Sequence, residues 1–240
     1  MAFENGEWIM KGLDWDDPTR IRSWKELISY VNEVGFLPLF ANDVPGFSAE
    51  EHISPLFWWT GDPEQDPWEW REIIARSGEI VYGKFIGQKA VFISKEWFPV
   101  FANYRRDGYD FDARWDDELA ELRQKKIMDR FDEKNEWIGA DLKKEAGFGK
   151  NGEKNFSGVL SELQMQTYLV IKEFRRKVNK RGAEYGMPVC VYARPEELWG
   201  REMVTSAYKE DPKQSAERIR EHLRTLWPEM TEKQLKKILR

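Results

Sequence analysis

Apolar residues repeat at the spacing of an amphipathic helix in several stretches of the chain. In the first, the apolar positions from Ile21 to Val34 share one face, Asp17-Pro18 supplies an N-cap and a first turn, and Gly35 supplies a left-handed C-cap. A charged helix is predicted over 117–132, with four residues inward: Leu119, Leu122, Ile127 and Phe131. Similar patterns predict further helices at 67–77, 94–101, 138–146, 153–166, 195–199, 212–226 and 231–239.

Alternating apolar and polar positions predict strands in the first half of the chain. Residues 79–85 and 89–93 are expected to form a hairpin around Gly87-Gln88. The apolar run 36–40 contains Pro38, which has no N–H to donate to a neighbouring strand. This run therefore predicts an edge strand or an irregular segment.

A second pair of strands is predicted at 167–174 and 189–193, joined by a basic loop at 175–188. Residues 42–66 contain repeated Pro and Gly, which predicts a long loop. Residues 103–115 are polar and aromatic without clear periodicity, and we expect an irregular connection there.

Over 118–200 the predicted order is helix, helix, helix, strand, basic loop and strand, which is typical of a winged helix. The predicted fold class is α+β, mainly helical, with tandem winged-helix-like units and short β-hairpins. The predicted parts are an acidic, Trp-rich N-terminal unit at 1–117, a winged-helix unit at 118–200 and a C-terminal helical tail at 201–240.

Charge and tryptophan are distributed unevenly along the chain. The overall net charge is −5, but residues 1–117 carry 12 basic and 22 acidic side chains, whereas 142–181 carry 10 basic and 4 acidic ones. Nine of the 12 Trp residues lie in the acidic first part. The average charge opposes tight non-specific nucleic-acid binding by the whole chain, but it leaves a local contact open.

Composition excludes several classes of protein. No apolar run approaches the roughly 20 residues of a membrane span, and the first residues have no signal-peptide pattern, so we expect a cytoplasmic protein without a membrane partner. The single Cys190 allows no internal disulfide. With only His52 and His222, a multi-histidine metal site or a histidine triad is not expected. We therefore expect no metal and no cofactor; the sequence leaves the oligomeric state open.

The basic segment 142–181 supplies candidate nucleic-acid contacts. A wing carries Lys and Arg to phosphates, while Asn and Gln on a third helix can bind adenine edges. The alternative is a solvated loop, or a module that binds a protein partner. The candidate residues are Lys150, Lys154, Asn155, Gln164, Arg175, Arg176, Lys177, Lys180 and Arg181.

Residues 125–182 and 189–200 resemble a winged-helix unit of the AlkZ/YcaQ family of DNA glycosylases. Units of that family end in a Tyr-x-Leu-Pro-Glu passage, which is similar to Tyr192-Ala-Arg-Pro-Glu196 here. Residues 23–44 resemble the family's first unit, in which a helix ends in Gly and continues into a strand. Most of the chain is similar to the bacterial AlkZ-related group, which implies winged-helix units and a link to DNA repair.

One departure from the glycosylases opposes their activity. Their Gln-x-Gln or Gln-x-Asp motif, which positions the attacking water, falls by position on Pro38 and Phe40. Neither side chain can polarise a water. Gln164-Met165-Gln166 has the motif's pattern, but it lies at the end of the third helix of the second unit. The resemblance therefore implies the fold more than the enzyme, and whether the chain is an enzyme stays open.

Two further functions are considered beside binding of DNA or a protein partner. One is a glycosylase-like repair enzyme that uses an unrecognised site. The other is a small-ligand binder that uses the Trp-rich half, because aromatic rings beside Arg can stack a base or ligand. The same residues can equally be core. The candidate pocket residues are Trp58, Trp59, Arg71, Tyr82 and Tyr104.

Overall fold

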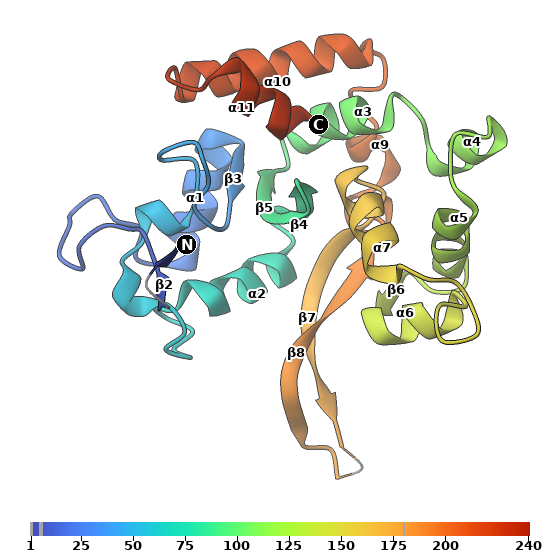
Figure 1. The fold of residues 1–240 in the computed structure, drawn as a ribbon, viewed down its shortest axis with the longest axis horizontal. Coiled ribbons are helices and arrows are strands. Elements are labelled where there is room, and N and C mark those ends of the chain that lie inside the picture. Colours follow the sequence, from blue (N-terminus) through green and yellow to red (C-terminus); the bar gives the residue numbers. More distant parts are fainter. Residues whose placement is uncertain (1, 5–6, 180) are drawn as a thin grey trace.

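The computed structural model describes residues 2–4, 7–179 and 181–240; for residues 2–4, 7, 8 and 177 it describes the backbone (Figure 1). The first part contains strands β1 (Ala2–Glu4), β2 (Glu7–Ile9), β3 (Phe36–Pro38), β4 (Ile80–Ile86) and β5 (Lys89–Ser94). Its helices are α1 (Trp24–Val34), α2 (Pro67–Ser77), α3 (Phe98–Arg106) and α4 (Phe111–Asp116), with 3-10 turns at Glu50–His52 and Pro55–Phe57.

The second part continues the α+β pattern. Its strands are β6 (Glu136–Ile138), β7 (Val170–Val178) and β8 (Glu184–Ala193). Its helices are α5 (Leu122–Met128), α6 (Gly139–Glu145), α7 (Phe156–Met165), α8 (Pro195–Trp199), α9 (Arg201–Val204), α10 (Pro212–Leu226) and α11 (Glu232–Leu239), and a 3-10 turn spans Asp129–Asp132.

The structure contains two antiparallel three-stranded sheets, and both have the same order of strands. The strand orders are β3-β5-β4 and β6-β8-β7, so the first strand of each sheet pairs with the third. Pro38 lies in β3 opposite Val91 of β5, at the edge of its sheet. The edge position expected from Pro38 is therefore confirmed, because an edge strand needs donors on one side only.

The start of α1 was predicted at Pro18, and the structure places it at Trp24. Ser23 is the actual N-cap, and its hydroxyl accepts a hydrogen bond from the Glu26 N–H at 3.2 Å. The Arg22 guanidinium donates to the carbonyls of Asp17 and Pro18, which holds the preceding residues in turns. Asp17 is a residue type that favours the N-cap position, but the helix begins after Ser23, six residues later, because local hydrogen bonds hold the intervening residues in turns.

The helix predicted at 117–132 is shorter than expected. It begins at Leu122, because Glu118 adopts a left-handed conformation with φ of 60° and Glu121 forms a capping box with Gln124. Leu119 and Leu122 are 51% and 56% exposed, so the expectation that they point inward is wrong. Ile127 and Phe131 are buried as predicted.

The connection expected at 103–115 contains two helices, the end of α3 and α4. Most of the basic loop expected at 175–188 is strand, since β7 extends to Val178 and β8 begins at Glu184. The turn between them is closed by Asn179, whose side-chain oxygen accepts from the N–H groups of Arg181 and Ala183. The result is a long two-stranded hairpin that projects from the body (Figure 1).

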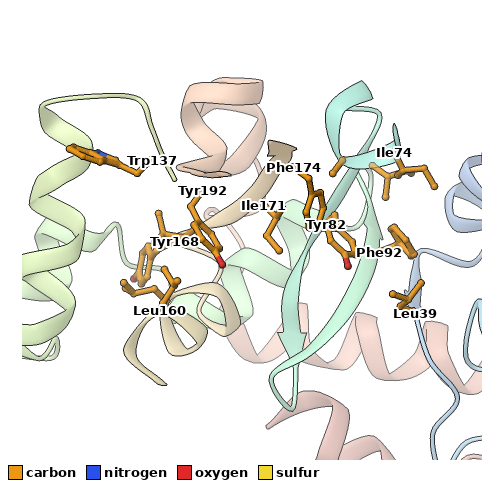
Figure 2. Close-up of a cluster of buried hydrophobic side chains, with 14 of the residues drawn as sticks. Leu39, Ile74, Tyr82, Phe92, Trp137, Leu160, Tyr168, Ile171, Phe174 and Tyr192 are labelled. Atoms are coloured by element: carbon orange, nitrogen blue, oxygen red, sulfur yellow. The ribbon is translucent and has the colours of Figure 1, made fainter. Parts of the chain in front are cut away.

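The two sheets share one hydrophobic core. Tyr82 of β4 packs against Phe92 of β5 and against Phe174 of β7, with ring centroids 5.0 and 6.1 Å apart. Figure 2 shows these rings in one continuous row with Ile171 and Tyr192 of the second sheet. The first and second parts are therefore joined by buried aromatic contacts, which makes them one packed body.

The C-terminal helices pack on the first part. Asn103 of α3 donates to the Ser215 hydroxyl of α10 at 3.0 Å, and Arg105 donates to the Ile238 carbonyl of α11 at 2.9 Å. Burial lowers the pKa of Arg105 to about 10. Because the α11 carbonyls lack helical partners, this guanidinium acts as their cap.

Candidate functional site

The projecting hairpin is the most basic surface feature among the sequence-predicted sites. We call residues 176–187 the arm; it contains Arg176, Lys177, Lys180 and Arg181, with Glu184 as its one acidic residue. Arg176 and Arg181 are exposed, and Arg176 donates to the Gly186 carbonyl across the hairpin at 3.0 Å. Lys180 and the side chain of Lys177 lie outside the described part of the chain.

Arg175 lies at the base of the arm and is already paired. Its guanidinium donates to Glu136 at 2.5 Å and forms an ion pair with Glu173. The hydrogen bond to Glu136 raises the pKa of Arg175, although partial burial opposes the shift. Lys172 pairs with the same Glu136. The positive charge that remains for a ligand therefore lies beyond Arg175, on the arm itself.

The loop before α7 forms a second basic surface. Lys143, Lys150 and Lys154 line an open hollow of about 470 Å³ at the start of this helix. The ammonium of Lys154 donates to the carbonyls of Gly149 and Lys150, at 2.9 and 2.8 Å. Asn155 is the N-cap, has φ of 62°, and makes no side-chain hydrogen bond to the first turn. Lys150, Lys154 and Asn155 are thus exposed at one end of α7.

Gln164 lies elsewhere, inside the protein. It is 1% exposed; its side-chain oxygen accepts from the Lys84 N–H of β4 at 3.1 Å, and its amide donates to the Leu160 carbonyl. Its polar groups are used to join α7 to the first sheet. The candidate role of Gln164 in binding a base edge does not fit this position, since the buried amide has no access to a groove.

Gln166, the other member of the Gln-x-Gln pattern, contacts the Gln124 side chain of α5 at 3.4 Å. The two glutamines therefore face different neighbours and do not converge on a shared water position. Pro38 and Phe40 likewise offer no polar group. Pro38 is buried in β3, and the Phe40 ring packs against Trp58 and Trp68 with centroids 5.4 and 6.3 Å apart.

The residues considered for a ligand pocket differ in exposure and lie in more than one region. Trp58, Arg71 and Tyr82 are buried at 5%, 7% and 4% exposure, and burial raises the pKa of Tyr82 to about 12. Tyr104 belongs to a different region, where its hydroxyl donates to the Leu239 carbonyl at 2.5 Å. Trp59 is 49% exposed.

Arg71 shows how this aromatic region is packed. Its guanidinium lies 3.6 Å from the Trp68 ring centroid and 4.3 Å from that of Phe174, and it pairs with Glu72 at 3.1 Å. The guanidinium is thus packed against two rings of this chain. The core interpretation of the Trp-rich half accounts for these contacts.

Another pocket, which sequence reasoning missed, lies between α4, α5 and α8. It has a volume of about 470 Å³ and an aromatic floor of Phe111 and Tyr168. Its walls are ion pairs, among them Arg194 with Asp132 at 2.9 Å and Arg201 with Asp110. Since each of these cations has a partner carboxylate, the walls hold paired charges.

Arg106 forms the inner end of this pocket and is 1% exposed. It donates to the Thr167 hydroxyl at 3.0 Å, the Thr167 carbonyl at 2.8 Å, Glu196 at 2.5 Å and the Tyr208 hydroxyl at 3.2 Å. Burial by itself would lower the pKa of Arg106, but Glu196 and Tyr208 outweigh it and the pKa lies above its usual range.

The Arg106 contacts explain the Tyr192–Glu196 passage in structural terms. The Glu196 carboxylate accepts a hydrogen bond from Arg106 in the first part of the chain, and Arg194 donates to the Phe131 carbonyl at 2.9 Å. The passage therefore fastens the end of β8 to α3 and to the Asp129–Asp132 turn. The Tyr-x-x-Pro-Glu motif made Glu196 recognisable in the sequence. No motif or periodic pattern marked Arg106, which lies in the polar and aromatic segment 103–115.

Together these observations define an α+β protein with two small antiparallel three-stranded sheets, a projecting basic hairpin and an ion-paired junction beside a pocket. A family model described as "AlkZ related" matches residues 21–240, nearly the whole chain, and the chain belongs to that family. The resemblance stated from the sequence is thereby confirmed. Searches of curated proteins and of solved structures each returned no match.

Within residues 2–4, 7–179 and 181–240, no helix has the length and apolar character needed to cross a bilayer. These residues also contain no group of three or more His, Cys, Asp or Glu side chains placed to hold a metal ion.

Proposed function

We propose that this AlkZ-related protein binds the nucleic-acid backbone through the arm and the loop before α7, without glycosylase chemistry at the position of the Gln-x-Gln motif. The observation that carries the proposal is the arm: four basic residues and one acidic residue on a hairpin that projects from a chain of net charge −5. Lys and Arg on a projecting element reach phosphates and release counterions.

The topology supports tandem winged-helix-like units as the scaffold. Each sheet has the first-third-second strand order, and α5, β6, α6, α7, β7 and β8 follow in the sequence expected of such a unit. We place the units within 1–117 and 118–200, with 201–240 as a helical tail. In this proposal β7 and β8 are the edges of the wing.

The buried third helix shapes the expected mode of binding. Because α7 packs against β4 and α5 and Gln164 is enclosed, its most exposed residues lie at the N-terminal end, with Lys154 and Asn155 just before the helix. We therefore propose contact with phosphates through Lys150, Lys154 and the arm, with little reading of base edges.

Direct binding tests the proposal. The variant carries Arg176→Ala, Lys177→Ala, Lys180→Ala and Arg181→Ala, and affinity for duplex and single-stranded DNA is measured by fluorescence anisotropy over a range of salt. Removing one cation that neutralises a phosphate reduces the salt slope by about 0.9 for duplex DNA. For the four substitutions we expect the slope to fall by about 3 to 4.

The matched control removes the same charge elsewhere, with Lys209, Lys213, Lys233 and Lys236 changed to Ala, all of them exposed. This control should keep the wild-type slope. Wild-type protein without salt-dependent binding, or equal reductions in slope for both variants, would refute the proposal. Incubation with alkylated DNA tests the chemistry: we expect no abasic sites, and abasic-site formation would contradict that part.

A further inference from the structure

A second exposed surface lies on the first part of the chain and combines large apolar side chains with acidic ones. We call residues 14–20 and 55–64 the acidic aromatic patch. Trp15, Leu56 and Trp59 are 61%, 67% and 49% exposed. Exposed apolar side chains in a group mark an interaction surface more often than isolated ones do.

The two segments of the patch are neighbours in space. Arg20 donates from Nε to the Trp15 carbonyl at 2.6 Å, and its guanidinium lies 4.7 Å from the centroid of the Phe57 ring. Leu13, just before the patch, also donates its N–H to the Ile53 carbonyl. Trp15 and the Pro55–Phe57 turn are therefore held on one side of the molecule.

The charge of the patch is strongly negative. It contains Asp14, Asp16, Asp17, Asp62 and Glu64, and its one basic residue is Arg20, whose side chain is turned to Trp15 and Phe57. The Arg22 guanidinium also reaches the patch, where it donates to the carbonyls of Asp17 and Pro18, so five carboxylates face two cations. A partner for this patch has to bring positive charge and apolar side chains together, since both features are exposed side by side.

The arm has those two features. It carries four basic residues against Glu184, and three of its apolar side chains are among the exposed ones: Val178 at 60%, Tyr185 at 52% and Met187 at 77%. The patch and the arm are therefore complementary in charge, and each offers three large apolar side chains for burial.

Within one molecule the two surfaces are apart. In Figure 1 the loops of the patch lie at the left end, whereas the arm extends downward from the middle of the molecule. The arm is continuous with the paired strands β7 and β8, whose registered pairs reach Val178 and Glu184. A contact between patch and arm therefore joins two molecules.

We infer that the arm of one copy docks on the acidic aromatic patch of a second copy, head to tail. The two surfaces are different, so the contact is heterologous and continues from copy to copy, as a ring or an open chain. Nucleic acid on the arm would compete with this contact; only that consequence rests on the proposed function. The contact itself follows from charge and exposure.

Charge reversal tests the inference on the full chain. The patch variant carries Asp14→Lys, Asp16→Lys and Glu64→Lys, and the arm variant carries Arg176→Glu, Lys177→Glu and Arg181→Glu. Sedimentation velocity at low salt follows association over a wide range of protein concentration. We expect wild-type association that weakens with salt, and at least about tenfold weaker association in either variant, because like charges then face each other.

Mixing the two variants distinguishes this contact from others. The reversed patch attracts the reversed arm, and the unchanged arm of the patch variant attracts the unchanged patch of the arm variant, whereas each variant alone brings like charges together. The mixture should therefore recover an association that neither variant shows alone. Circular dichroism checks that both variants fold, and a third variant with Lys209→Glu, Lys213→Glu and Lys236→Glu should associate like the wild type.

The inference is overturned if the wild type is monomeric at low salt, if either reversal leaves association unchanged, or if the mixture forms no complex. The patch variant separates this result from the proposed function, because it leaves the arm intact. Loss of association with normal DNA binding supports the docking of arm on patch and leaves the proposed function standing. Normal association without DNA binding would refute the proposed function alone.

Discussion

Among substitutions of single polar side chains, the removal of Arg106 should lower the free energy of unfolding most. It is enclosed at 1% exposure and donates four hydrogen bonds, two to Thr167 and one each to Glu196 and Tyr208. These partners come from segments 61 to 102 residues away in sequence. The change Arg106→Ala therefore breaks a junction between the two parts of the chain.

The size of the stability loss follows from the buried groups that lose their partner when the guanidinium is removed. Removing one partner of a buried ion pair costs about 3–5 kcal/mol, because the other charge stays without compensation. The Glu196 side chain is 24% exposed and regains some hydration, which favours the low end of that range. Thr167 is fully buried, and its hydroxyl and carbonyl are both left without the guanidinium, which adds to the cost. We expect the free energy of unfolding to fall by about 3–4 kcal/mol.

Urea unfolding followed by Trp fluorescence measures this change as a lower midpoint at unchanged slope. The matched control is Arg218→Ala, which removes an arginine that is 50% exposed and pairs with Glu210. An exposed pair contributes roughly 0–1 kcal/mol, so the control should shift the midpoint little. Equal destabilisation in the two variants would refute the reasoning that burial makes the Arg106 hydrogen bonds strong.

Two further predictions concern stability. Gln164→Ala should cost about 1–2 kcal/mol in urea unfolding, because the Lys84 N–H loses its acceptor, and should leave DNA affinity unchanged; weaker DNA binding at unchanged stability would contradict the internal role. The hydrogen bond from Lys172, with help from Arg175, lowers the pKa of Glu136 below its ordinary 4.5, so its contribution to stability is present above pH 4.5 and is lost as the pH falls through the lowered pKa. Glu136→Gln should therefore flatten the decline of the unfolding midpoint below pH 4.5, and an unchanged decline would refute the assignment.

Several elements were predictable because their signals are local. Asp66-Pro67 begins α2 and Asp211-Pro212 begins α10, each with the Asp side chain accepting a backbone N–H of the first turn. The β4–β5 hairpin turns at Gly87-Gln88 as expected. Caps and turns depend on a few neighbouring residues, so the amino-acid types are sufficient to place them.

Two errors show how the backbone path overrode a pattern of residue types. Periodicity placed Leu119 and Leu122 inward, but the chain turns at Glu118 and leaves both exposed. The basic residues after Phe174 suggested a loop, although pairing with β8 extends the strand through them. A local left-handed turn decided the first case and strand pairing decided the second.

The sequence by itself determined the family, the α+β class, several helix starts and the location of the positive charge. Only the tertiary structure decided which of the candidate residues have access to a ligand. Gln164 and Arg71 are enclosed, Arg175 is paired with Glu136, and Arg176 and Arg181 are exposed on a projecting arm. The physical reason is that residue type sets what a side chain can bind, whereas its exposure depends on segments packed against it from elsewhere in the chain.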